Sequence, residues 1–251
     1  MSETRQGWAT VWGKRAHYAE AGAGPTVLVA PGLGLSTRFY EPVLMSFARA
    51  GVRLIVPDLP GFGRTKGPAT GMAVPDVARW LLGLADALQL QRPGWLGHSV
   101  GCQAALEIAA AAPERAAALA LAAPTGVPAR FRLARQLLAL PCAAAREPTR
   151  VLLAVLRDYV RVPLGAYLGS WIRAGADHPV GKLDLIRCPT LLLVGARDPI
   201  VPWRDVARLR DGIAGSRITV IRRGCHALPL DAMDVFTPTV ADFFRGVVPF
   251  D

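Results

Sequence analysis

The chain has 251 residues, of which 52% are hydrophobic, and a length of this order fits one large domain with a well-buried core. Its formal net charge of +10 can favour anionic partners, but it has neither a zinc finger nor a stacking motif interleaved with basic residues, which argues against a nucleic-acid partner. Its opening lacks the apolar stretch of a secretory signal and its apolar runs are too short for a bilayer, so we expect a cytoplasmic protein without a membrane span.

Strands and helices are predicted to alternate along the first half of the chain. The segment ATVWGKRAHYAEAG alternates enough to indicate a β-hairpin that turns at Gly13. Beyond it, the apolar runs predict strands at 26–32, 52–58 and 117–124, and the helical patterns predict helices at 37–51 and 75–88. Another strand ends near Trp95 and Leu96, and a helix follows it. This alternation is typical of an α/β sheet with crossover helices.

The alternation stops at residues 125–182, which hold only helical patterns interrupted by five prolines. It then resumes with strands at 190–198 and 217–223, a helix at 203–211 and a last helix at about 230–246. We therefore predict a core domain made of residues 1–124 and 183–251, with 125–182 inserted as a helical cap.

One serine lies between two glycines where a strand is predicted to give way to a helix, in the sequence Gly97-His98-Ser99-Val100-Gly101. A sharp strand-to-helix turn lifts a serine side chain above the sheet edge, where a carbonyl carbon can reach it. Strand and helix then lie so close that the residues two before and two after the serine must be tiny. The N-terminal N–H groups of the helix also point at the place where negative charge would develop. The motif therefore predicts a nucleophile at Ser99.

With this motif and the order of its elements, the chain resembles the α/β-hydrolase family over nearly its whole length. The resemblance implies a mostly parallel eight-stranded sheet with helices on both faces and a helical cap inserted after the sixth strand. It also implies a triad in the chain order serine, acid, histidine. LLLVGARDPIVP then supplies Asp198 as the acid, and RITVIRRGCHALPLD supplies His226 as the base.

The residues support the same assignment independently. Of the four histidines, His17 lies in the predicted hairpin, His98 in the serine motif and His178 at the end of the insertion; only His226 follows the end of a strand. Loops at such strand ends line the crevice where open α/β sheets bind ligands. The loop after the earlier strand, APTGVP, contains no carboxylate, which leaves Asp198 as the acid.

An oxyanion hole needs two backbone N–H donors. The resemblance assigns them to Val100, which follows the nucleophile, and to Leu33, in the loop after the strand TVLVA. This loop reads Pro31-Gly32-Leu33 where the family usually has His-Gly-x, so the proline changes how the loop is anchored. In the segment PDLPGFGRT, which also matches a family turn, we interpret the acidic residue and the glycines as loop architecture: Asp58, Gly61 and Gly63.

The insertion carries nine basic residues against three acidic ones: Arg130, Arg132, Arg135, Arg146, Arg150, Arg157, Arg161, Arg173 and Lys182 against Glu147, Asp158 and Asp177. Two interpretations stay open. The arginines can form a solvated face, or a rim that attracts a substrate bearing a carboxylate or phosphate. The aromatic residues Tyr159, Tyr167 and Trp171 can line a pocket or pack in the core.

The expected activity is hydrolysis of an ester or thioester of a small organic substrate through an acyl-enzyme, by a monomer or homodimer. No cofactor or metal is expected, because the four cysteines are scattered and none has a histidine at zinc-ligand spacing. Three alternatives remain: hydrolysis of a C–C bond in a β-diketone-like substrate, acyl transfer to an acceptor other than water, and a ligand-binding receptor with slow turnover. Fold and triad alone do not name the substrate.

Overall fold

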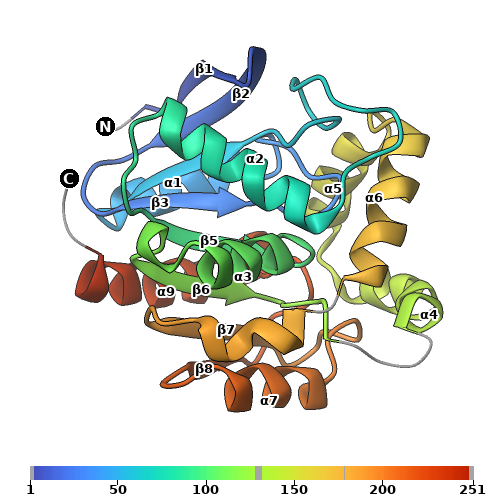
Figure 1. Cartoon of the computed structure of the whole chain (residues 1–251). Coiled ribbons are helices and arrows are strands. Elements are labelled where there is room, and N and C mark those ends of the chain that lie inside the picture. Colours follow the sequence, from blue (N-terminus) through green and yellow to red (C-terminus); the bar gives the residue numbers. More distant parts are fainter. Residues whose placement is uncertain (1–2, 128–131, 178, 249–251) are drawn as a thin grey trace.

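The computed structural model describes residues 3–127, 132–177 and 179–248, and these residues contain one eight-stranded sheet (Figure 1). The strand order is β1-β2-β4-β3-β5-β6-β7-β8. The strands are β1 (Arg5–Val11), β2 (Lys14–Ala21), β3 (Thr26–Ala30), β4 (Arg53–Pro57), β5 (Gly94–His98), β6 (Ala118–Ala122), β7 (Thr190–Gly195) and β8 (Arg217–Ile221). The predicted number of strands is therefore confirmed.

The sheet is antiparallel only at the edge formed by β1 and β2. β1 pairs with β2 and β2 with β4 in antiparallel register, and the other five pairings are parallel. The hairpin turns at Trp12 and Gly13, whose φ angles of 48° and 76° are both positive, as a type I′ turn requires. Every residue of β3, β5, β6 and β7 is buried, as expected for parallel strands covered on both faces.

Helices cover both faces of the sheet. In Figure 1, α2 (Val74–Ala87) and α3 (Gly101–Ala111) lie in front of it, and α1 (Glu41–Arg49) and α9 (Met233–Val247) lie behind it. Nine of the eleven residues of α3 are buried. Alanines make up much of this helix, and their small side chains let it pack closely on all sides. The remaining core elements are the short helix η1 (Pro113–Arg115), α7 (Trp203–Gly212) and α8 (Leu228–Asp231).

Two predicted helices differ from the observed ones. The first begins at Glu41 rather than at residue 37, because Pro42 fits the first turn of a helix, where its missing N–H is not needed. The last helix is divided into α8 and α9 at Ala232, whose φ and ψ of −122° and 34° are not helical. The carboxylate of Asp231 accepts a hydrogen bond from the Cys225 N–H, which ties α8 back to the preceding loop instead of to α9.

The segment between β6 and β7 is helical, as predicted, and lies at the carboxyl ends of the strands (Figure 1). It contains α4 (Arg132–Arg146), α5 (Thr149–Tyr159), α6 (Leu164–Ala176) and η2 (Pro179–Leu185), which we call the cap. Pro148 and Pro163 immediately precede α5 and α6, where proline can start a helix but not continue the one before it. Among the described helices, none is both long and apolar enough to cross a membrane.

Candidate active site

The turn at Ser99 is strained in the way that the two flanking glycines predict. Ser99 has a φ of 54°, in the left-handed region that side chains rarely adopt. A Cβ at Gly97 would lie 2.7 Å from the Cα of Cys102, and a Cβ at Gly101 would lie 2.0 Å from the Ala30 carbonyl oxygen. The Ser99 N–H donates to the Ala122 carbonyl at 2.9 Å, which ties the turn to β6. Both glycines are therefore sterically required.

Three residues far apart in the sequence meet at this turn. The Ser99 Oγ lies 2.8 Å from Nε2 of His226, and Nδ1 of His226 lies 2.8 Å from Oδ2 of Asp198. The other carboxylate oxygen of Asp198 accepts the N–H groups of Ile200 and Val201 at 2.7 and 3.3 Å. The side chain of Asp198 is fully buried, so it is held in place on both sides. Since a carboxylate can only accept, Nδ1 of His226 carries the proton and Nε2 is free to accept from the serine hydroxyl.

The carboxylate and the imidazole shift each other's pKa. Burial alone would raise the pKa of Asp198, but the facing His226 and the hydrogen bonds that Asp198 accepts hold it below its usual value. Burial would lower the pKa of His226, but Asp198 outweighs burial, with smaller contributions from Glu147 and Asp231, and raises that pKa. His226 is therefore protonated more readily beside Asp198 than an isolated imidazole is.

This pKa shift predicts the pH dependence of any reaction in which His226 is the base. The neutral imidazole is the active form, so kcat/KM should rise with pH. The midpoint of this rise should lie above the ordinary histidine pKa of 6.5. Asp198→Asn should move the midpoint downward, because the main group that raises the pKa is removed. A pH–rate profile on a neutral ester measures both, and a wild-type midpoint below 6.5 would contradict the expected environment of His226.

Burial and the neighbouring Asp231 raise the pKa of Glu147 to about 7, so this residue can titrate in the same pH range as His226. The pH–rate profile therefore needs a control for Glu147. Glu147→Gln removes this titration and retains an oxygen that can accept a hydrogen bond. The acid limb should persist in this variant if His226 causes it.

The predicted oxyanion donors lie in the same cavity as Ser99 and His226. Leu33 and Val100 both line it, and within the described part of the chain neither of their N–H groups donates a hydrogen bond. The neighbouring Gly32 N–H donates to the Tyr40 hydroxyl at 3.1 Å. Leu33 and Val100 thus line the same cavity as Ser99, and their role as oxyanion donors stays a prediction.

The loop that contains Pro31 and Leu33 is anchored by a chain of hydrogen bonds through Tyr40 and His98. The Tyr40 hydroxyl donates to Nδ1 of His98 at 2.8 Å, and Nε2 of His98 donates to the His226 carbonyl at 3.1 Å. Burial lowers the pKa of His98 to about 3, so its ring stays neutral and supplies one donor and one acceptor. These two residues connect the loop of Leu33 to the loop of His226, a role that the sequence analysis did not predict.

Another residue missed from the sequence is Glu147, in the turn between α4 and α5. Its Oε1 accepts the Ala227 N–H at 2.9 Å, next to His226. Among the described residues, Glu147, Cys225 and Asp231 could bring three metal-ligand atoms within 4.8 Å of one another. Burial, with the two carboxyl groups, raises the pKa of Cys225 to about 11, and its thiol points to the Arg146 carbonyl at 3.2 Å. In this structure the cluster is thus held by hydrogen bonds within the protein, from the Cys225 thiol to the Arg146 carbonyl and from the Ala227 N–H to Glu147.

The remaining predicted residues fall into two groups. Asp58 is buried and accepts hydrogen bonds from His17, Thr37 and Arg64, consistent with a role in loop architecture. His178 lies outside the described residues, as does Arg130.

The cavity has a volume of about 380 Å³ and is mostly apolar. Tyr159, Tyr167 and Trp171 of the cap line it, so they face the pocket. No arginine or lysine is among its described lining residues, and Arg150, Arg157 and Arg161 are exposed on the outside of the cap. Glu147 is the only carboxyl group in that lining. The hydrogen-bonded pair of Ser99 and His226 therefore faces a largely apolar cavity.

Comparisons with known proteins agree with the fold. The family model described as alpha/beta hydrolase fold matches residues 25–140. The chain is 29% identical over 256 residues to the putative carbamate hydrolase RutD of Variovorax paradoxus (strain S110), covering 92% of this chain and 96% of that protein. It is 30% identical over 261 residues to the pimeloyl-[acyl-carrier protein] methyl ester esterase of Pectobacterium carotovorum subsp. carotovorum (strain PC1), covering 92% and 98%. The crystal structure of the enol-lactonase from Burkholderia xenovorans LB400 has a TM-score of 0.82 at 22% identity, covering 94% and 99%.

Proposed function

The chain belongs to the α/β-hydrolase family, and on that basis we propose that it is a serine hydrolase that cleaves an ester or thioester of a small, neutral, apolar substrate. One observation carries the proposal: the hydrogen-bonded series Ser99–His226–Asp198 opens into an apolar cavity that Leu33 and Val100 also line. The relatives named above act, by their names, on a carbamate and on a methyl ester. In both compounds a carbonyl carbon bears an oxygen substituent.

In the proposed mechanism, Ser99 Oγ attacks the carbonyl carbon while its proton passes to Nε2 of His226. Asp198 keeps the imidazole in the required tautomer and stabilises the cation that forms. The carbonyl oxygen becomes an oxyanion and accepts the Leu33 and Val100 N–H groups; one such donor typically contributes a factor of about 10²–10³ to kcat. The imidazolium then protonates the leaving alcohol or thiol. Water then attacks the acyl carbonyl while one of its protons passes to Nε2 of His226. The bond to Ser99 Oγ breaks, the imidazolium returns the proton to Oγ, and the acid is released.

The preference for a neutral acyl group follows from the described lining. A carboxylate buried in this cavity would meet no arginine or lysine among the described lining residues and would lie near Glu147, so its desolvation would be poorly compensated. The arginines of the cap would then form a solvated face. An apolar acyl chain gains from the same surface, at about 25 cal/mol per Å² of apolar area removed from water.

The test is a panel of 4-nitrophenyl esters of increasing acyl length, each paired with an ester of equal length that ends in a carboxylate. We expect the neutral ester of each pair to have a kcat/KM at least about tenfold higher, since one uncompensated charge costs more than the 1.4 kcal/mol that this factor represents. We also expect its kcat/KM to change little between about 0.01 and 0.1 M ionic strength, over which the screening length falls from about 30 to about 10 Å.

Replacing Arg150, Arg157 and Arg161 together by glutamine is the matched control. If the carboxylate esters are preferred, and both salt and the triple variant reduce their kcat/KM, the arginines recruit an anionic substrate and the proposed substrate class is wrong. Including a β-diketone and an added alcohol in the same panel distinguishes C–C hydrolysis and acyl transfer from ester hydrolysis. A single acylation without turnover would indicate a receptor.

A further inference from the structure

The loop that carries Leu33 runs from Gly32 to Arg38, and we call it the oxyanion loop. Two turn hydrogen bonds shape it, from the Leu35 N–H to the Gly32 carbonyl at 3.1 Å and from the Phe39 N–H to the Ser36 carbonyl at 3.0 Å. These bonds fix the curvature of the loop but do not by themselves fix its position over the cavity. That position depends on side chains from other elements.

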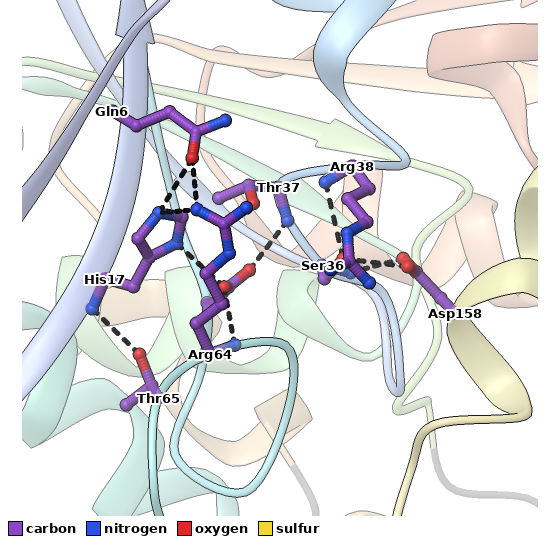
Figure 2. Close-up of polar contacts among 9 residues, drawn as sticks. Gln6, His17, Ser36, Thr37, Arg38, Arg64, Thr65 and Asp158 are labelled. Carbon is purple, nitrogen blue, oxygen red and sulfur yellow. Dashed lines mark hydrogen bonds and ion pairs between the residues drawn. The ribbon is translucent and has the colours of Figure 1, made fainter.

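The cap supplies one of these side chains, Asp158, near the end of α5. Its Oδ2 accepts the Ser36 N–H at 2.7 Å and its Oδ1 accepts the Ser36 hydroxyl at 2.8 Å, as Figure 2 shows. Asp158 is only 4% exposed although it lies on a helix with two exposed arginines, Arg150 and Arg157. Both carboxylate oxygens are thus directed to one residue of the oxyanion loop, which is separated from Asp158 by 122 positions in the sequence.

The next residue of α5 reaches the same loop at the proposed donor itself. The Tyr159 hydroxyl donates to the Leu33 carbonyl at 3.2 Å. Gly34 allows this approach: its φ is 79°, and a Cβ there would lie 2.9 Å from the Tyr159 ring. The ring of Tyr167, on α6, packs against Tyr159 with centroids 5.3 Å apart. Two consecutive cap residues therefore hold the loop at Leu33 and at Ser36.

The core holds the adjoining peptide of the same loop. The Thr37 N–H donates to Oδ1 of Asp58 at 2.7 Å, and Oδ2 of Asp58 accepts Nδ1 of His17 at 2.8 Å. Figure 2 shows this second group of contacts beside the first, with His17 also bound through its N–H to Thr65. Asp58 and His17 are almost completely buried, so this end of the loop is fixed to the sheet. The loop is thus attached to the core at Gly32 and Thr37 and to the cap at Leu33 and Ser36.

We propose that Asp158 is a positioning residue for the oxyanion hole, through which docking of the cap sets the place of the Leu33 N–H. The inference rests on the proposed function, because it assigns Leu33 to transition-state stabilisation. When the cap is docked, Asp158 and Tyr159 hold Ser36 and Leu33 against α5. When these contacts are absent, only the Thr37–Asp58 bond and the chain through Gly32 hold the loop. The donor is then less precisely placed, and an oxyanion is bound less well while a neutral carbonyl is bound almost equally.

The experiment compares Asp158→Ala, Asp158→Asn and Ser36→Ala with Arg157→Gln, a control at an exposed position beside Asp158 on the same helix. Since one oxyanion donor is worth a factor of about 10²–10³, a displaced one should lower kcat by about 10- to 100-fold in Asp158→Ala with KM changed less than about threefold. Asp158→Asn keeps one acceptor oxygen, so its kcat should lie between those of Asp158→Ala and the wild type. Arg157→Gln should retain wild-type kcat.

A second readout separates positioning from a general loss of structure. The serine oxygen attacks the carbonyl carbon of a trifluoromethyl ketone, and the carbonyl oxygen becomes an oxyanion. The matching methyl ketone binds largely as a neutral carbonyl. Affinity for the first should fall in parallel with kcat in Asp158→Ala, and affinity for the second should not. Equal losses for both ketones, or wild-type kcat in Asp158→Ala, would overturn the inference. A wild-type protein that neither hydrolyses esters nor binds the trifluoromethyl ketone would instead overturn the proposed function.

Discussion

Replacing Ser99 by alanine is expected to lower kcat by about 10⁶-fold on the preferred neutral ester, because removal of the nucleophile of a serine hydrolase leaves only the oxyanion hole and substrate binding. The fold should be preserved, since alanine is smaller than serine and the Ser99 N–H, which bonds to the Ala122 carbonyl, remains. KM should change little. The measurement is steady-state hydrolysis, with thermal unfolding measured in parallel.

A suitable control is Ser216→Ala. Ser216 lies just before β8, at the amino end of that parallel strand and thus at the edge of the sheet away from the catalytic loops. This variant should retain wild-type kcat. If Ser99→Ala kept activity within tenfold of wild type, another group would have to be the nucleophile.

Asp198→Asn should lower kcat by about 10⁴-fold while changing the melting temperature by no more than a few degrees. The asparagine oxygen can keep the hydrogen bonds from the Ile200 and Val201 N–H groups. Its NH₂ group then faces Nδ1 of His226 and donates to it, so the proton moves to Nε2. A ring protonated at Nε2 cannot accept the proton of Ser99.

The comparison variant for this prediction is Asp211→Asn, at an exposed carboxylate that forms an ion pair with Arg210. It should leave both kcat and the melting temperature near the wild-type values, as surface ion pairs contribute little. An Asp198→Asn protein with normal kcat would show that the orienting acid lies elsewhere. A large loss of stability would instead indicate that Asp198 acts mainly on the fold.

Much of the fold could be predicted because local patterns and architecture agree. Parallel strands buried on both faces read as continuous apolar runs, and TVLVA and TLLLVG are found as β3 and β7. The two glycines around Ser99 are explained by contacts of 2.0 and 2.7 Å that any side chain would make. The structure also brings Ser99, His226 and Asp198 into hydrogen-bond distance, and their catalytic roles stay predictions.

The parts that could not be predicted depend on contacts between distant segments. Asp158 looks in the sequence like one acidic residue on a basic helix, and only the structure shows that it is buried against Ser36. His98 is next to Ser99 in the sequence, but its bonds to Tyr40 and to the His226 carbonyl span 58 and 128 positions. A lone acidic residue among arginines, and a histidine preceding the nucleophile, were the available signals.

The positions of the cap arginines could not be predicted from their number in the sequence. Their number in the sequence left open an anionic substrate, yet those with described side chains are on the outside of the cap or away from the cavity lining. Composition gives the charge of a segment but not the direction in which its side chains point. The division of the chain into a core domain of residues 1–124 and 183–251 and a cap of residues 125–182 likewise stays a prediction, as do the cytoplasmic location and the oligomeric state.

The most direct test of the central claim is peptide mapping by mass spectrometry after reaction with a fluorophosphonate, in the wild type and in His226→Ala. We predict a single adduct per chain on the Ser99 hydroxyl, formed much more slowly in His226→Ala because no base removes the serine proton. An adduct on another residue, or no adduct in a protein that hydrolyses esters, would contradict the assignment of Ser99 as the nucleophile.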